Sequence, residues 1–167
     1  ETLIVVTADH ETGGIALGTG KYALNLKALE NQKASAEVLS KKISDLRKAK
    51  NNHVAWEDIK NLLSEEMGFW SVLPITWEQE KKLRDEYEKS FVRNKVEFAE
   101  SMYAKTEPMA AKAKEVMDQI AMVGWTSGGH SAGYVPVFAI GAGSDLFIGK
   151  MDNTEIPKRI AKAGGYK

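Results

Sequence analysis

The chain has 167 residues, and its 23 basic residues balance its 23 acidic residues, so the formal net charge at pH 7 is zero. This balance gives no electrostatic reason to expect nucleic acid or an anionic membrane as a partner. The sequence contains no cysteine, which excludes disulfides and thiolate metal sites.

The first predicted element is a strand at residues 2–8. Its apolar and largely β-branched run predicts a strand that is covered on both faces. Asp9 and His10 follow at the carboxyl end of this strand, and Gly13 and Gly14 permit a sharp turn after them. A solvated turn is the simpler interpretation of an isolated Asp-His pair. However, a carboxylate oxygen beside an imidazole nitrogen suits zinc, so the pair is a candidate metal site.

Residues 15–29 are predicted to form a strand or hairpin, since Tyr22, Leu24 and Leu26 alternate. Helices follow, and their apolar stripes have the spacing of core packing rather than of a ligand groove. The first of these helices is expected to start at a cap at Ser35, and the second is expected to cover residues 55–67 and to stop at Gly68. A capping box at Thr76 and Gln79 is expected to open a third helix, which runs towards Tyr103. The last helix is expected to run from Pro108 to Gly124.

The segment after Gly124 contains a second candidate ligand. His130 lies among glycines, where the backbone can approach a ligand closely, and strands are expected near residues 134–140 and 145–149. Taken alone, His130 is typical of an exposed loop. Taken with Asp9 and His10, it indicates a shared metal centre. A short helix capped by Asn153 or Thr154 is expected to close the chain.

Composition divides the chain into two kinds of material. Thirteen of the fourteen glycines lie outside residues 30–118, whereas 33 of the 46 charged residues lie within that range. We therefore expect an α/β protein in which residues 1–29 and 119–167 form a core with a small mixed sheet. Residues 30–118 are expected to form a helical insert, which we interpret as a cap beside the site.

Three segments together resemble the C-terminal part of bacterial alkaline phosphatases. They are the strand and loop at 2–14, the Gly-His-Ser segment before residues 135–138, and the ending at 152–160. The resemblance implies that Asp9 and His10 belong to the zinc that holds the nucleophile, and that His130 belongs to a neighbouring zinc. It also implies a magnesium ion, a phosphate monoester substrate, a serine that becomes phosphorylated, and a periplasmic or extracellular location. Two zinc ions about 4 Å apart can clamp both the attacking and the leaving oxygen.

The resemblance further implies a fragment, because the family's nucleophilic serine, its other zinc and magnesium ligands and its phosphate-binding arginine match nothing in this sequence. The arginines at 47, 84, 93 and 159 all fall in charge-rich helical stretches. We expect no catalytic residue within the chain, no activity of the isolated chain, and a need for the missing N-terminal part of the same polypeptide. No signal peptide is visible, which carries no information for a fragment. Exposed sheet edges would favour a homo-oligomer.

Two alternatives remain open. Cofactor-independent phosphoglycerate mutases have a similar Ala-Asp-His strand end and a later histidine before a Val-Pro strand, although residues 11–14, the insert and residues 152–160 resemble the phosphatases more. The other alternative is a non-catalytic binding module. It is favoured by Ser127 and Ser131, which have no second histidine placed to activate either hydroxyl.

Overall fold

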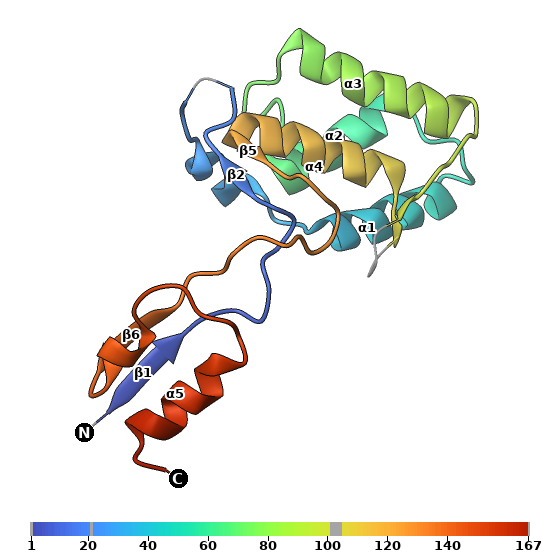
Figure 1. Cartoon of the computed structure of the whole chain (residues 1–167). Coiled ribbons are helices and arrows are strands. Elements are labelled where there is room, and N and C mark those ends of the chain that lie inside the picture. The colour runs from blue at the N-terminus through green and yellow to red at the C-terminus, as the bar shows by residue number, and fades with distance from the viewer. Residues whose placement is uncertain (1, 21, 101–104, 167) are drawn as a thin grey trace. The chain divides into compact units, whose positions relative to one another are not determined.

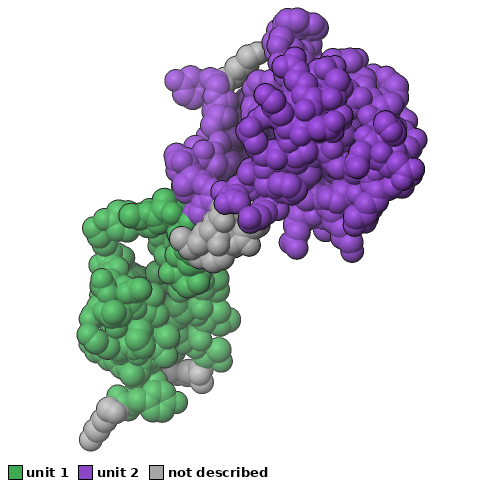
Figure 2. All heavy atoms as spheres, turned by 90° about the vertical axis from the view of Figure 1, so that its right-hand side faces the viewer, with its two compact units in different colours: residues 1–14, 130–167 green, residues 15–129 purple. Residues whose placement is uncertain are grey.

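The computed structural model describes residues 2–20, 22–100 and 105–166. The chain forms two compact units, which Figure 2 colours separately: unit 1 contains residues 1–14 and 130–167, and unit 2 contains residues 15–129. Unit 2 therefore interrupts unit 1 in the sequence. The helices and strands (Figure 1) are β1 Leu3–Val6, β2 Ala16–Leu17, α1 Ala36–Ala49, α2 Trp56–Met67, α3 Trp77–Tyr87, β3 Ala99–Glu100, β4 Lys105–Thr106, α4 Pro108–Ala121, β5 Val123–Gly124, β6 Phe138–Gly141 and α5 Glu155–Ala163.

Unit 1 is built on the antiparallel pair β1 and β6, with α5 beside it (Figure 1). Ile4 lies opposite Ile140, and Val6 lies opposite Phe138. Side chains alternate between the two faces of a strand, so these four share one face. Leu3 and Val5 lie on the other face, towards α5. The α/β class is therefore confirmed, although the described strands pair as three separate two-stranded antiparallel sheets rather than as one mixed sheet.

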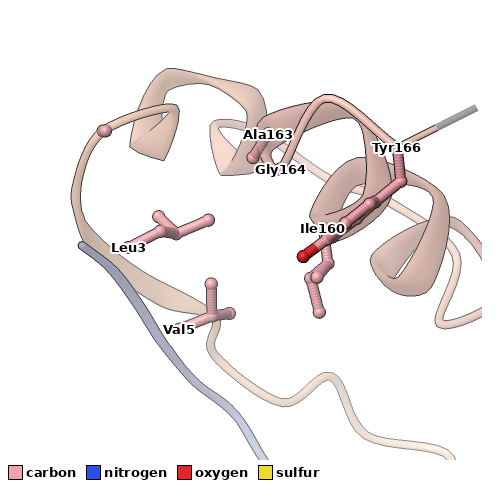
Figure 3. A pocket seen from close by; sticks show the side chains of 7 residues that line it. Leu3, Val5, Ile160, Ala163, Gly164 and Tyr166 are labelled. Atoms are coloured by element: carbon pink, nitrogen blue, oxygen red, sulfur yellow. The ribbon is translucent and has the colours of Figure 1, made fainter. Parts of the chain in front are cut away.

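The face of β1 towards α5 borders a cavity of about 520 Å³. Figure 3 shows Leu3 and Val5 on one side of it and Ile160 of α5 on the other. Among the described lining residues the only polar side-chain group is the Tyr166 hydroxyl. A cavity without charged groups offers little to a phosphate or a metal ion.

The expectation that β1 is covered on both faces is wrong for the described chain. The side chains of Ile4, Val6, Phe138 and Ile140 are each more than half exposed. The apolar run at the start of the sequence predicts that a strand forms. Whether each face of that strand is buried depends on which other elements pack against it. Here α5 covers one face only.

Unit 2 holds the main hydrophobic core, in which α1, α2 and α3 pack against the central helix α4. Helix α4 contributes Met109, Ala110, Ala113, Val116 and Met117, all of which are buried. The alanines permit close approach of α1 and α3, which both contact α4. The sequence prediction that the methionine and aromatic stripes form a core is therefore confirmed.

Local hydrogen bonds define the predicted helix starts. The Ser35 hydroxyl accepts a hydrogen bond from the Val38 N–H, at 3.2 Å, at the start of α1. Thr76 and Gln79 exchange the two hydrogen bonds of a capping box at the start of α3. Gly68 ends α2 in the left-handed conformation, with φ of 72°. These starts and ends are as the sequence predicts.

Other predicted elements are corrected by the structure. Of the strand or hairpin predicted for residues 15–29, only Ala16–Leu17 form a strand, and a 3-10 helix forms at Leu26–Asn31. Tyr22 is fully exposed and Leu24 and Leu26 are about half exposed, so the alternating residues share no buried face. In place of a strand at 145–149, a 3-10 helix forms at Ser144–Phe147 after the left-handed Gly143.

Two predicted helix ends are also corrected. Helix α3 ends at Tyr87 and continues only as a π turn to Val92, and the predicted end at Tyr103 lies outside the described residues. Helix α4 ends at Ala121, because Met122 adopts the left-handed conformation and Val123–Gly124 pair with β2.

The start of α2 predicts a pH-dependent stability. The Asp58 carboxylate accepts a hydrogen bond from the Ala55 N–H, at 2.9 Å, and lies 3.0 Å from Lys50 Nζ. The Ala55 hydrogen bond first, and then Lys50, lower the pKa of Asp58. The stabilisation is therefore present above the unfolded pKa and is lost as the pH falls through the folded pKa.

Asparagine resembles the protonated acid, so we expect Asp58→Asn to lower the melting temperature at neutral pH and to lower it progressively less as the pH falls through the folded pKa of Asp58. Thermal unfolding followed by circular dichroism over a series of pH values from neutral to acidic checks this. An equal change at every pH would contradict it.

Candidate metal centre

Asp9, His10 and His130 all lie in unit 1. Asp9 and His10 follow β1, at the bend where the chain leaves the sheet, and His130 begins the second segment of the unit. The structure brings the two histidines together: their rings stack with centroids 3.4 Å apart and planes inclined by 24°. Residues 120 positions apart in the sequence are therefore in direct contact.

The bend orients Asp9 and His10 towards each other. One carboxylate oxygen of Asp9, Oδ1, accepts a hydrogen bond from the His10 backbone N–H, at 3.1 Å. The other, Oδ2, lies 3.4 Å from His10 Nε2. His10 Nδ1 lies 2.7 Å from the Glu11 carbonyl oxygen. A carbonyl oxygen can only accept, so Nδ1 is the donor in this contact, and in the neutral imidazole Nε2 keeps its lone pair for a ligand.

The separation of these two donor atoms fits a zinc ion. Ligand atoms at about 2.0–2.1 Å from one tetrahedral zinc lie about 3.3–3.4 Å from each other. Asp9 Oδ2 and His10 Nε2 are 3.4 Å apart. One hard oxygen and one borderline nitrogen are also the donor types that zinc accepts. The pair could thus hold half of a four-coordinate site.

The donor set is incomplete. No group of three or more His, Asp, Glu or Cys side chains able to hold a metal ion occurs among residues 2–20, 22–100 and 105–166. His53, the third histidine, sits in the turn after α1 within unit 2. A structural zinc site normally needs four protein ligands. The described chain accordingly offers parts of a centre rather than a closed site.

Sequence reasoning missed Glu11 at this place. Its carboxylate accepts a hydrogen bond from the backbone N–H of Ser131, and another from Gly14, at 2.5 Å. A side-chain hydrogen bond with Ser131 is the largest cause that lowers the pKa of Glu11, and the Gly14 N–H and the His130 ring act in the same direction. The sequence feature that could have indicated Glu11 is its position directly after the Asp9-His10 pair, where a third polar side chain can reach the same site.

Both serines and three of the four arginines considered as reactive groups have structural partners. The Ser127 hydroxyl donates to the Gly129 carbonyl oxygen, and the Ser131 hydroxyl accepts from the Gly133 N–H. Arg47 binds Glu107, Arg84 binds Glu80 and Arg159 donates to the Leu146 carbonyl oxygen. These contacts engage the two serine hydroxyls in local turns and the three arginine side chains in ion pairs or hydrogen bonds.

Comparisons with known proteins agree with these features. The alkaline phosphatase family model matches residues 1–166. Alkaline phosphatase 3 of Bacillus subtilis strain 168 is 31% identical over 176 residues, which cover 99% of this chain and 30% of that protein. Alkaline phosphatase 4 of the same organism is 26% identical over 162 residues, which cover 96% of this chain and 29% of that protein.

A solved structure is also similar. The crystal structure of a cold-active alkaline phosphatase from a psychrophilic Shewanella matches 97% of this chain and 34% of that one, with a TM-score of 0.63 and 25% identity. The chain thus spans about a third of the length of the relatives it matches. In the part of the chain that the structure describes, no helix has the length and apolar character needed to cross a bilayer. By its match over nearly every residue, the chain belongs to the alkaline phosphatase family.

Proposed function

We propose that this chain is part of a zinc-dependent phosphate monoester hydrolase and contributes Asp9 and His10 to one zinc site and His130 to its neighbour. The observation that carries the proposal is the convergence of these residues. The His10 and His130 rings stack, and Asp9 Oδ2 lies 3.4 Å from His10 Nε2, which is the separation of two ligand atoms on one zinc ion. Family membership supports the reaction class.

The chain's own residues would bind and orient. Asp9 supplies negative charge to a cation, and the Glu11 carbonyl oxygen holds the His10 ring in the tautomer whose Nε2 can ligate. Zinc, when bound, supplies a Lewis acid that stabilises negative charge on phosphoryl oxygens. The nucleophilic serine, the magnesium ligands and the remaining zinc ligands belong, in this proposal, to the N-terminal part of the same polypeptide.

The exposed face of the β1–β6 pair supports such a partner. Ile4, Val6, Phe138 and Ile140 form a continuous apolar surface in unit 1. Burying one such side chain contributes about 1.5–3 kcal/mol, so this face would stabilise a docked segment strongly. The relatives are about three times as long as this chain, so they contain additional sequence that can cover the corresponding face. In the isolated chain the same surface would promote self-association into a homo-oligomer.

The helical insert and the location complete the proposal. Residues 30–118, all of which lie in unit 2, form a cap-like insert between the two core segments of the sequence, residues 1–29 and 119–167. Typical members of the family act outside the cytoplasm, so we place the enzyme in the periplasm or outside the cell.

An assay of two polypeptides tests the proposed function. The chain joined to its N-terminal part should hydrolyse an aryl phosphate in the presence of zinc, and the 167-residue chain alone should not, because three ligands divided over two sites leave each zinc incompletely bound. Phosphoglycerates serve as the competing substrate class. Robust turnover by the isolated chain, or transfer confined to phosphoglycerates, would refute the proposal. So would submicromolar zinc affinity of the chain that survives replacement of Asp9, His10 and His130 by alanine.

A further inference from the structure

The Glu11 side chain connects two loops that are distant in sequence. One carboxylate oxygen, Oε2, accepts from the Gly14 N–H, at 2.5 Å, within its own turn. The other, Oε1, accepts from the Ser131 N–H, 120 positions along the chain. The first bond only shapes the turn after β1. The second bond couples that turn to the loop that carries His130.

The position of this link relates it to the histidines. Glu11 directly follows His10, and Ser131 directly follows His130. The backbone carbonyl of Glu11 also accepts from His10 Nδ1, at 2.7 Å. One residue therefore sets the rotation of the His10 ring through its main chain and holds the His130 loop through its side chain.

The surrounding backbone leaves room for this arrangement. A Cβ atom added at Gly133 would lie 3.0 Å from Glu11 Cγ and 3.3 Å from Ser131 Oγ. Such contacts are tighter than normal packing, so a side chain at this position would push against the carboxylate. The Gly133 N–H instead donates to Ser131 Oγ, at 3.2 Å. The loop thus folds around the Glu11 side chain.

We propose that Glu11 is a positioning residue that fixes the spacing of the two metal-binding loops, an inference that rests on the proposed function of Asp9, His10 and His130. Hydrogen bonds from N–H groups to a carboxylate are charge-assisted and short, so the link is strong enough to hold two loops in register. Glutamine keeps one acceptor oxygen but replaces the other with a donor, so it can satisfy only one of the two N–H groups.

Zinc affinity in the full-length protein tests the inference. We expect Glu11→Ala to weaken zinc binding about 10–100-fold, measured by competition with a chromophoric chelator, with Glu11→Gln in between. Excess zinc should restore the kcat of Glu11→Ala without changing its KM. A variant that had lost its fold would not recover in this way. The matched control is Thr12→Ala, an exposed neighbour in the same turn. Zinc affinity of Glu11→Ala equal to that of the unsubstituted protein would overturn the inference.

A second measurement separates this inference from the proposed function. His53 lies in unit 2, so its signal is an internal reference for the histidine NMR signals of unit 1. The stacked rings of His10 and His130 should give a nuclear Overhauser effect that Thr12→Ala keeps and Glu11→Ala and Glu11→Gln weaken. If the unsubstituted full-length protein binds no zinc, the proposed function fails, and this signal alone decides the positioning role. Its persistence in Glu11→Ala would refute that role.

Discussion

Replacement of Glu107 by alanine is expected to lower the free energy of unfolding of this chain by about 3–5 kcal/mol, because it leaves a largely buried cation without its partner. The Glu107 side chain is 1% exposed, and its Oε1 lies 2.9 Å from Arg47 Nη2. Its Oε2 accepts from the N–H groups of Met109 and Ala110, at 2.7 and 3.1 Å, in the first turn of α4. The substitution removes an ion pair and a helix cap together.

Arg47 joins three elements through this pair. Its second guanidinium nitrogen donates to the Ser90 carbonyl oxygen, at 3.2 Å, and the guanidinium lies 3.6 Å from the centre of the Phe91 ring. Ser40 of α1 accepts from the Glu107 N–H, at 3.0 Å. Loss of the carboxylate therefore affects α1, α4 and the π turn at once.

Urea unfolding followed by circular dichroism measures the effect. Glu107→Gln keeps an acceptor for the cap and loses the charge, so we expect an intermediate value. The matched control is Glu97→Ala, which removes the exposed ion pair with Lys89 and should change the stability little, because solvent screens an exposed pair. A Glu107→Ala variant as stable as Glu97→Ala would show that the buried pair contributes little.

Replacement of Asp9 by asparagine is expected to lower kcat/KM for an aryl phosphate about 100-fold or more in the full-length protein, and to reduce its zinc content. In the proposed zinc site, asparagine would keep the size of the side chain and lose the negative charge that offsets the cation. Since even partners outside the ligand set change metal affinity about 10–100-fold, loss of the charge of a proposed ligand should have at least that effect.

His53→Ala is the control for this experiment, because it removes an exposed histidine from the turn after α1. Zinc content by atomic absorption and initial rates at saturating zinc separate a binding defect from a defect in turnover. Unchanged zinc content and rate in Asp9→Asn would remove Asp9 from the site, and equal losses in His53→Ala would point to damage that is not specific to the centre.

Much of unit 2 could be predicted from the sequence, since its helix ends depend on residues three or four positions apart. Ser35, the Thr76 and Gln79 pair, and Gly68 act through contacts within one turn, so their spacing is visible in the chain itself. Errors occurred where tertiary contacts decide. Val123–Gly124 extend the pattern of α4 but pair with β2 instead.

By itself, the sequence determined the α/β class, the helix caps of unit 2, the family, and the presence of Asp9, His10 and His130 as candidate ligands, because each of these depends on residue type and short spacing. Only the tertiary structure decided that the His10 and His130 rings meet, that Glu11 links their loops, and that Arg47 is bound to Glu107. These contacts join positions 60 to 120 residues apart. No local periodicity encodes them, because they form only when packing of the whole unit brings distant backbone segments together.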